Sequence, residues 1–355
     1  MELYPCSSRR DIQGDHSLVP SSVLFAAGLL GNIIAFIILW QHKLNVKSKK
    51  TSVFYMMVTG LTIINLTGKI VVCPVVIAAY SKNETLFQLT ENQNLCHFFA
   101  FCMTFFGLAP TLILLAMAVD CWLALAYPFT YLRCITNKVG LVVPLVSCVF
   151  SLGFCSLPFF GIGRFVQYCP GTWCFIEMTV RDSASKDLIY SMLYGTIMGV
   201  LVMAIIFFNG AIMRKLYNMY RNNSMRTVVG FKVGNKGMNG GQAQMKELDH
   251  LILLAVMTVI FAICSLPLTA RVYIGVFTDK HNEYYDLIVL RLLSMNSVMD
   301  PWIFIICRTS NFHRHIRVLC GKLRAKTHGK SHFLQQSVSL RLSDFNTSAV
   351  NATPC

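Results

Sequence analysis

Seven apolar segments, each long enough to cross a lipid bilayer, constrain this chain more than any other feature. They are the ranges 21–41, 52–79, 97–124, 139–163, 188–213, 250–276 and 286–307. A transmembrane helix needs about 20 predominantly apolar residues. Only 13% of the residues are charged, whereas soluble domains carry about 25%. The sequence therefore predicts an all-α membrane protein, a bundle of seven transmembrane helices.

The distribution of basic residues orients this bundle. Most of the 31 Lys and Arg lie in three connections and in the tail, at 41–50, 125–138, 214–247 and after Cys307. Only Lys69 and Arg291 are assigned to the spans. By the positive-inside rule, residues 1–20 are extracellular and the C-terminus is cytoplasmic. Residues 1–20 lack the apolar core of a cleavable signal peptide. The net charge of +15 thus reflects topology and attraction to anionic membrane lipid, not nucleic-acid binding.

The chain after the last span divides into two parts. Residues 308–322 carry Phe312, Ile316 and Leu319 at helical spacing with basic residues between them. This pattern predicts a short amphipathic helix on the inner leaflet, with a plain cytosolic helix as the alternative. The Ser/Thr-rich residues 323–355 are predicted to be a disordered cytoplasmic tail.

The outer side holds an even number of cysteines. Of the 14 Cys, only Cys6, Cys96, Cys169 and Cys174 fall there, which permits two disulfides in any of three pairings. The sequon that begins at Asn83 also lies in an outer loop, so we expect Asn83 to be glycosylated.

Arg291 is a permanent cation inside the last span. Placing a guanidinium in a bilayer costs about 2.5–3.5 kcal/mol even on lenient scales, so it normally faces the bundle interior and an anion. By helical rise Arg291 lies only about 8 Å below the start of its segment. A ligand with a negatively charged head could therefore reach it. The alternative is that Arg291 snorkels outward and pairs with Asp286, Glu283 or phospholipid.

Three further polar residues interrupt the spans. Asn65 precedes Lys69 by four positions, so both share one helix face. Asp300 follows Arg291 by nine positions, which places the two on opposite faces of a regular helix. We therefore expect Asp300 to be partnered by Asn65 or Lys69 rather than by Arg291. A polar cluster that only packs helices together is the alternative interpretation.

The loop 167–175 contains two cysteines, Trp173, Phe175 and a Pro-Gly turn, but no charge. Pro-Gly favours a tight turn, and the large aromatic side chains require burial. These features predict a folded lid over the mouth of the bundle, held by disulfides.

The chain resembles the rhodopsin-like G-protein-coupled receptors, and within them the prostanoid receptors. The resemblance rests on Gly31-Asn32 in the first helix and Asp300-Pro301-Trp302-Ile303-Phe304 in the last. It extends to the lid Gln167–Phe175 and to Arg291-Leu292-Leu293-Ser294, which looks like the family's carboxylate-binding stretch. The stretch Ser52–Met56 and the sequence Cys121-Trp122-Leu123 are most similar to the DP type, which binds prostaglandin D2.

The resemblance implies a plasma-membrane receptor that signals through Gs to raise cAMP and binds arrestin through its tail. Prostaglandin D2 is the implied ligand, with prostacyclin or prostaglandin E2 as alternatives. No cofactor or metal is implied. The implied ligand-binding residues are Arg291 for the carboxylate, Tyr80, Thr172, Lys69, Ser294 and Trp173. The implied disulfides are Cys96–Cys174 and Cys6–Cys169. Ordinary hydrogen bonding and packing remain the alternative role for Tyr80 and Thr172.

The chain departs from the wider family at its activation switch, which would involve Asp120, Asp300 and Asn65. The usual Arg is absent after Asp120, where the sequence reads Cys121-Trp122. The sixth span reads Cys264-Ser265-Leu266-Pro267 and lacks the usual Trp. Asn65 stands where most relatives have Asp, which disfavours a bound Na⁺.

Two other classes of protein are weaker alternatives. Asp120 and Asp300 could suggest an intramembrane aspartyl protease, but Asp120 lies at the cytoplasmic end and Asp300 lacks a Gly-rich context. A transporter is disfavoured because the sequence has no inverted repeat.

Overall fold

The computed structural model describes residues 19–45, 53–90, 93–178, 185–228, 237–277 and 283–308. The expected extracellular segment before Val19, the amphipathic helix at 308–322 beyond Arg308, and the tail at 323–355 lie outside these residues. Those three expectations therefore stay predictions.

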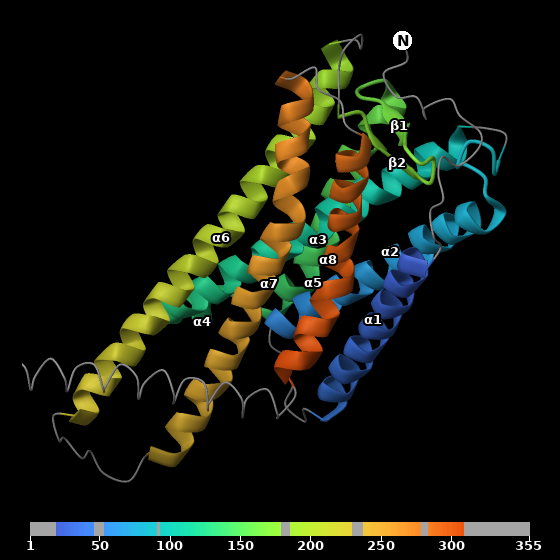
Figure 1. Ribbon diagram of the computed structural model, residues 1–355. Helices are drawn as coiled ribbons and strands as arrows, with labels where there is room; N and C mark the ends of the chain where they lie inside the picture. Colours follow the sequence, from blue (N-terminus) through green and yellow to red (C-terminus); the bar gives the residue numbers. More distant parts are fainter. Residues whose placement is uncertain are drawn as a thin grey trace, which may run out of the picture. The chain divides into compact units, whose positions relative to one another are not determined.

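Seven helices in the described part of the chain are long and apolar enough to cross a membrane, as predicted. They are α1 (Val19–Asn45), α2 (Val53–Lys82), α3 (Asn94–Ala126), α5 (Asn137–Cys155), α6 (Ser185–Val228), α7 (Gly237–Phe277) and α8 (Glu283–Arg308) (Figure 1). A short helix α4 (Pro128–Cys134) and a 3₁₀ turn η1 (Leu157–Phe160) flank α5. Several helices run beyond the apolar segments, since helical hydrogen bonding continues past the hydrocarbon core.

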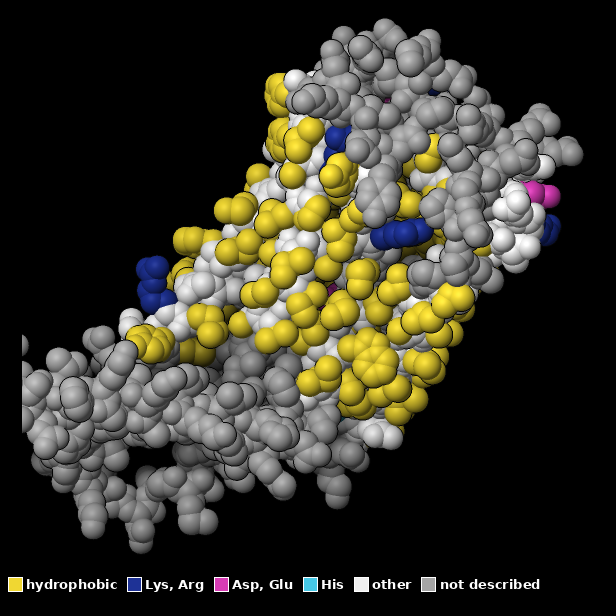
Figure 2. Space-filling model, viewed as in Figure 1, with side chains coloured by type: hydrophobic (Ala, Val, Ile, Leu, Met, Phe, Trp, Pro, Cys, Tyr) yellow, Lys and Arg dark blue, Asp and Glu magenta, His cyan; other side chains and the backbone are white. Residues whose placement is uncertain are grey.

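Helix α3 occupies the middle of the bundle. Within its most apolar window 61% of the residues are buried, compared with 22% for the span that contains α5. Apolar side chains cover the outer surfaces of the helices, as on the face shown in Figure 2. Val149 and Phe207 are examples, with exposed fractions of 70% and 68%. In a membrane protein such side chains face lipid, so their exposure is expected.

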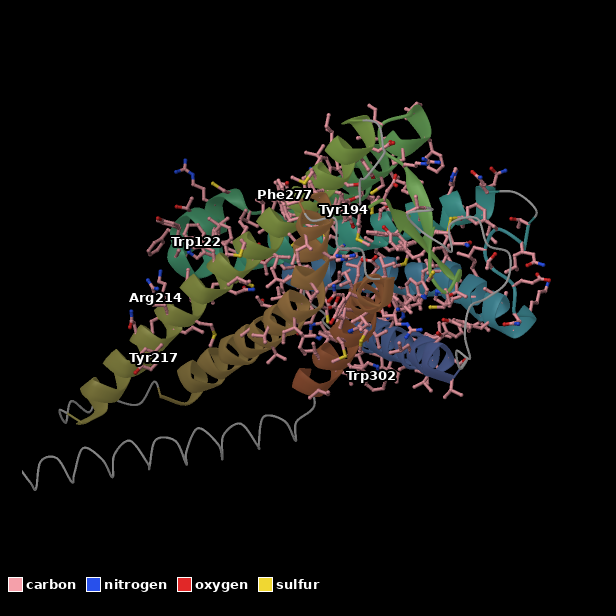
Figure 3. The ribbon with its side chains drawn as sticks, turned by 45° about the horizontal axis from the view of Figure 1, so that its top comes forward. Trp122, Tyr194, Arg214, Tyr217, Phe277 and Trp302 are labelled. Atoms are coloured by element: carbon pink, nitrogen blue, oxygen red, sulfur yellow. A yellow bond between two sulfur atoms is a disulfide. The ribbon has the colours of Figure 1, made fainter. Side chains whose placement is uncertain are left out.

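Helices α1 and α8 approach closely at a glycine. A Cβ atom on Gly31 would lie 2.8 Å from Nε1 of Trp302, so only glycine fits there. The indole Nε1 of Trp302 (Figure 3) donates to the Ala27 carbonyl oxygen at 3.0 Å, and Asn32 Nδ2 donates to the Ser297 carbonyl oxygen at 3.0 Å. The Gly31-Asn32 and Asp300–Phe304 motifs thus fix one helix against the other.

A two-stranded antiparallel hairpin follows η1 at the outer end of the bundle (Figure 1). Strand β1 (Phe165–Tyr168) pairs with β2 (Trp173–Ile176), with Phe165 opposite Ile176. Every residue in both strands is buried. The predicted lid is confirmed, but its strands were not predicted, because four residues are too few to show an alternating pattern.

Candidate ligand-binding site

A cavity opens inside the outer half of the bundle and extends toward its centre. It is lined by residues of α1, α2, α3, α7 and α8 and by Trp173 of the lid. Its volume is about 100 Å³. Most of the lining is apolar, including Leu24, Val72, Met103, Leu114 and Phe261. Its polar and ionisable lining groups are Ser21, Asn65, Lys69, Cys73, Thr111, Arg291, Ser294, Asn296, Ser297 and Asp300.

Arg291 lies at the cavity with its guanidinium pointing toward α2. Its Nη2 donates to the hydroxyl oxygen of Tyr80 at 3.4 Å, and the same oxygen accepts a hydrogen bond from Thr172 Oγ1 at 3.2 Å. Among the described side chains, no carboxylate lies within ion-pair distance of Arg291. The three residues that the resemblance assigned to a carboxylate are therefore connected, and the cation retains donors for an anion.

Lys69 is the second cation of the cavity. Its side chain is 6% exposed, and its Nζ donates to the Ser294 carbonyl oxygen at 3.0 Å. The lysine stem packs along α1, since a Cβ on Gly28 would lie 3.0 Å from the Lys69 Cε. Of the two partners expected for Asp300, Lys69 was the wrong one, because its ammonium group binds the α8 backbone instead.

Asp300 is paired with Asn65, the other expected partner. Asn65 Nδ2 donates to Asp300 Oδ2 at 3.1 Å, and both residues are buried. Asp300 does not pair with Arg291, as predicted, although both line the same cavity from opposite faces of α8. The lining residues of α8 include a series at every third position, 291, 294, 297 and 300, together with Leu293 and Asn296. Each step falls about 60° short of a full turn, so the cavity winds about half way around α8.

A buried ion pair near the outer ends of α7 and α8 was not predicted. Arg271 lies inside the sixth span, so assigning only Lys69 and Arg291 to the spans was wrong. Its Nε pairs with Asp286 Oδ1, and its Nη2 donates to Asp286 Oδ2 at 3.4 Å. The side chains are 9% and 0% exposed. Asp286 is therefore the partner of Arg271 and not of Arg291.

A disulfide and the hydrogen bonds of one tyrosine hold the lid in place, with Trp173 at the cavity. Cys96 at the start of α3 is bonded to Cys174 of β2, as the resemblance implied. Tyr168 Oη donates to the Ile176 carbonyl oxygen at 2.7 Å and accepts from Met178 N. Trp173 lines the cavity, and its Nε1 is buried without a hydrogen-bond partner among the described residues.

The second expected disulfide involves a residue outside the described chain. Cys169 is disulfide-bonded, but its expected partner, Cys6, lies outside the described residues. Asn83, the expected glycosylation site, follows α2 in the first outer loop and is exposed, with a positive φ of 56°.

Asn296 and Ser265 join α7 to α8 where the wider family has a Trp. Asn296 Nδ2 donates to Ser265 Oγ at 2.9 Å. Asn296 also lines the cavity, and its Oδ1 is buried without a hydrogen-bond partner among the described residues. Asn296 therefore connects the lining of the cavity to α7 through Ser265.

At the cytoplasmic end of α3, the Asp120 carboxylate accepts a hydrogen bond from a tyrosine, although the usual Arg is absent from the sequence. Tyr131 Oη of α4 donates to Asp120 Oδ1 at 3.1 Å. Burial and the nearby Asp120 carboxylate raise the pKa of Tyr131, so its hydroxyl stays a donor at physiological pH. Trp122 (Figure 3) packs edge-to-face on Phe208 of α6, with ring centroids 5.5 Å apart. These contacts tie α3 to α4 and α6 on the inner side.

Taken together, the cavity has one acidic end and two cations in an apolar enclosure. Arg291 lies toward its outer part, Lys69 lies deeper beside Ser294, and the hydrogen-bonded Asp300 lies at its inner end. Such a lining suits an elongated apolar molecule with a single anionic head and a few polar substituents.

Comparisons with known proteins agree on the family. Residues 31–304 match the model of the 7 transmembrane receptor (rhodopsin family). The human prostaglandin D2 receptor is 45% identical over 326 residues, covering 87% of this chain and 91% of that protein. The mouse prostaglandin D2 receptor is 41% identical, covering 96% and 99%. The dog prostaglandin E2 receptor EP2 subtype is 38% identical, covering 97% of each chain.

Among solved structures, squid rhodopsin is similar in fold alone. The TM-score is 0.67 at 14% sequence identity, covering 91% of both chains.

Proposed function

This chain belongs to the rhodopsin family of seven-transmembrane receptors and, within it, to the prostanoid receptors of the plasma membrane. We propose that its ligand is prostaglandin D2 and that the receptor, once it has bound this ligand, activates Gs. The family excludes the protease and transporter alternatives, because its members are receptors. A lipid ligand and a G-protein partner follow from the family. The ligand's identity and the choice of Gs are the proposal.

The single observation that carries the ligand-binding site is the availability of Arg291. This cation lines an apolar cavity and donates a hydrogen bond to the neutral hydroxyl of Tyr80. A prostanoid carboxylate would satisfy the guanidinium by a charge-assisted pair and accept further hydrogen bonds from Tyr80 and Thr172. Trp173 also lines the cavity, and its buried Nε1 has no hydrogen-bond partner among the described residues.

Lys69 and Ser294 lie deeper in the cavity, where we propose that they contact the polar groups on the ring of the ligand. The Lys69 ammonium group holds one hydrogen bond to the Ser294 carbonyl and has two further donors. A ring oxygen of the ligand would compete for them. The prostaglandin D2 receptors at 41–45% identity favour this ligand over others, and the DP-like motifs in α2 and α3 agree.

The cytoplasmic side offers a surface for a G protein. Phe129 and Leu132 on α4 are 88% and 80% exposed, and Tyr131 between them is bonded to Asp120. Because α4 follows α3 directly, a change in α3 would alter how these apolar side chains are presented. The choice of Gs, and arrestin binding by the tail at 323–355, rest on the family resemblance.

Prostaglandin E2 is the second candidate ligand, because EP2-subtype receptors are 38–40% identical over nearly the whole chain. Prostacyclin remains the third. A panel of prostaglandin D2, prostaglandin E2 and a stable prostacyclin analogue, read out as cAMP in cells expressing the receptor, distinguishes them. We expect prostaglandin D2 to be the most potent. A tenfold advantage of another prostanoid, about 1.4 kcal/mol, would refute the ligand assignment, and a fall or no change in cAMP would refute Gs.

A further inference from the structure

The segment that joins α5 to the lid carries exposed apolar side chains, although a turn that faces water is usually polar. Phe159 and Phe160 end η1, Ile162 follows, and all three are exposed. Phe160 has the largest exposed fraction of the three, 79%. The candidate span that contains α5 and its exposed Val149 runs to Phe160. The apolar surface that α5 turns to lipid therefore continues outward along this segment.

A cation ends the segment where the lid begins. Arg164 is exposed, and its backbone carbonyl oxygen accepts the amide hydrogen of Glu177 at 3.0 Å, which holds Arg164 at the edge of the hairpin. Gly163 has a φ of +100°, and an added Cβ would lie 2.5 Å from the ring of Tyr190, so the turn is packed closely on α6. A guanidinium fork matches phosphate geometry. Exposed phenylalanines followed by an arginine thus match the acyl chain and the phosphate of a phospholipid.

The same segment also packs on the lid. The ring of Phe159 lies edge-on to the ring of Phe165, the first residue of β1, with centroids 5.7 Å apart. On α3, the ring of Phe101 is likewise 5.7 Å from Phe159. A lipid molecule in contact with this segment would therefore touch a residue that supports the lid.

We propose that Phe159, Phe160, Ile162 and Arg164 form a docking surface for a phospholipid of the outer leaflet, and that this surface anchors the lid to the membrane. The acyl chains lie on the three apolar side chains, and the phosphate group lies on the Arg164 guanidinium. None of these four residues lines the ligand cavity. The docking surface is therefore distinct from the proposed prostanoid site.

Tryptophan fluorescence tests the apolar part of the surface. The full-length receptor with Phe160→Trp is placed in phosphatidylcholine nanodiscs with brominated acyl chains, because bromine quenches tryptophan at contact range. The signal of the four native tryptophans is subtracted with the wild type. We expect the emission of the added tryptophan to fall at least about twofold relative to unbrominated discs. Gln93→Trp, at an exposed polar position before α3, should change little. Equal quenching of the two variants would overturn the proposal.

Lipid retention tests the charged part. Native mass spectrometry measures how much phosphatidylcholine, or diacylglycerol without a phosphate, stays bound to the receptor. We expect Arg164→Gln to retain about threefold less phosphatidylcholine than wild type and as much diacylglycerol. Arg164→Lys should retain most of it, and so should Lys82→Gln, which removes an exposed cation at the end of α2. Equal phosphatidylcholine retention in wild type and Arg164→Gln, or a parallel loss of diacylglycerol, would refute the phosphate contact.

Ligand dissociation tests the anchoring of the lid, and this measurement rests on the proposed function. A lid without its anchor should open more often, so prostaglandin D2 should leave Phe160→Ser in nanodiscs at least about threefold faster than wild type. Phe207→Ser is the matched control, because Phe207 is exposed on α6 beside Phe208, toward the inner side. Equal acceleration in both variants would refute anchoring. If prostaglandin D2 does not bind the wild type, the proposed ligand is wrong, and the quenching result still decides the docking surface.

Discussion

Tyr131 donates its hydroxyl hydrogen to the Asp120 carboxylate at 3.1 Å, which joins the short cytoplasmic helix α4 to the inner end of α3. In the wider family an Arg after this acidic residue performs the local pairing. Here Cys121 follows instead, and Tyr131 donates the hydrogen bond to the carboxylate. The position of α4, with its exposed Phe129 and Leu132, therefore depends on a neutral donor.

Replacing Tyr131 by Phe should weaken G-protein activation without changing ligand binding. A hydrogen bond to a charged group contributes about 1.5–3 kcal/mol, and its loss would free α4 from α3. We expect the maximal agonist-stimulated cAMP response to fall at least about threefold, with the ligand Kd unchanged. Tyr127→Phe, which removes an exposed hydroxyl from the same segment, is the matched control. An unchanged response in Tyr131→Phe would show that α4 is held by other contacts.

The same tyrosine makes a prediction about pH. The pKa of Tyr131 is raised in the folded protein. The stabilisation from its hydrogen bond to Asp120 is therefore complete below the ordinary tyrosine pKa, and it is lost as the pH rises toward the raised pKa. Agonist-stimulated nucleotide exchange in membranes should therefore show no titration from Tyr131 between about pH 6 and 9. A wild-type transition in that range that disappears in Tyr131→Phe would contradict this assignment.

Replacing Arg291 by Ala should remove high-affinity prostanoid binding while the receptor still reaches the cell surface. Truncating one member of a buried charge pair costs about 2 kcal/mol or more, equivalent to at least thirtyfold in Kd. Arg291→Lys should lose less, since it retains the charge but not the planar fork. The measurement is radioligand competition, corrected for surface receptor by an antibody to an N-terminal tag. Wild-type affinity in Arg291→Ala would refute the carboxylate site.

Replacing Lys69 by Leu should alter selectivity among prostanoids more than expression. Leucine removes a buried ammonium group that needs a partner, so folding should not suffer, but the polar ring contact would be lost. We expect the potency ratio between prostaglandin D2 and prostaglandin E2 to shift at least about threefold in the cAMP assay. Equal changes in potency for both ligands would mean that Lys69 does not distinguish between their rings.

Replacing Gly171 by Ala should destabilise the lid. Gly171 has a φ of +107°, and an added Cβ would lie 2.4 Å from Thr85 Cγ2 of the first outer loop. Strained backbone of this kind costs about 1–3 kcal/mol, so the Tm of the purified receptor should fall by several degrees. Gly153→Ala is the control, because a Cβ there meets nothing within 4 Å. Equal Tm values for the two variants would contradict the close packing at Gly171.

The spans, the lid and the Asn65–Asp300 pair could be predicted because each depends on local pattern or on a charge that needs a partner. Arg271 shows where such reasoning failed. It lies inside the apolar segment 250–276, so the sequence alone already places it with Lys69 and Arg291 among the cations of the spans. Its partner Asp286 lies across a loop on the next helix, and only the packing of α7 against α8 shows that the two meet.

The path of the cavity was also beyond the sequence. Arg291 and Asp300 lie on opposite faces of α8, as their spacing predicts, yet both line one cavity because the lining winds around the helix. Helical periodicity gives the direction of each side chain from its own axis. It does not give the course of the space between several helices, which depends on the volumes of all their side chains.

The buried hairpin over the cavity affects how long a ligand stays bound rather than how tightly it binds. With Trp173 against the cavity and Cys174 bonded to Cys96, a bound molecule cannot leave through the lid unless the hairpin moves as a unit. Departure is then limited by how often the protein opens, and two ligands of equal Kd can differ in residence time. We expect the duration of a response after agonist washout to follow the opening rate of this hairpin.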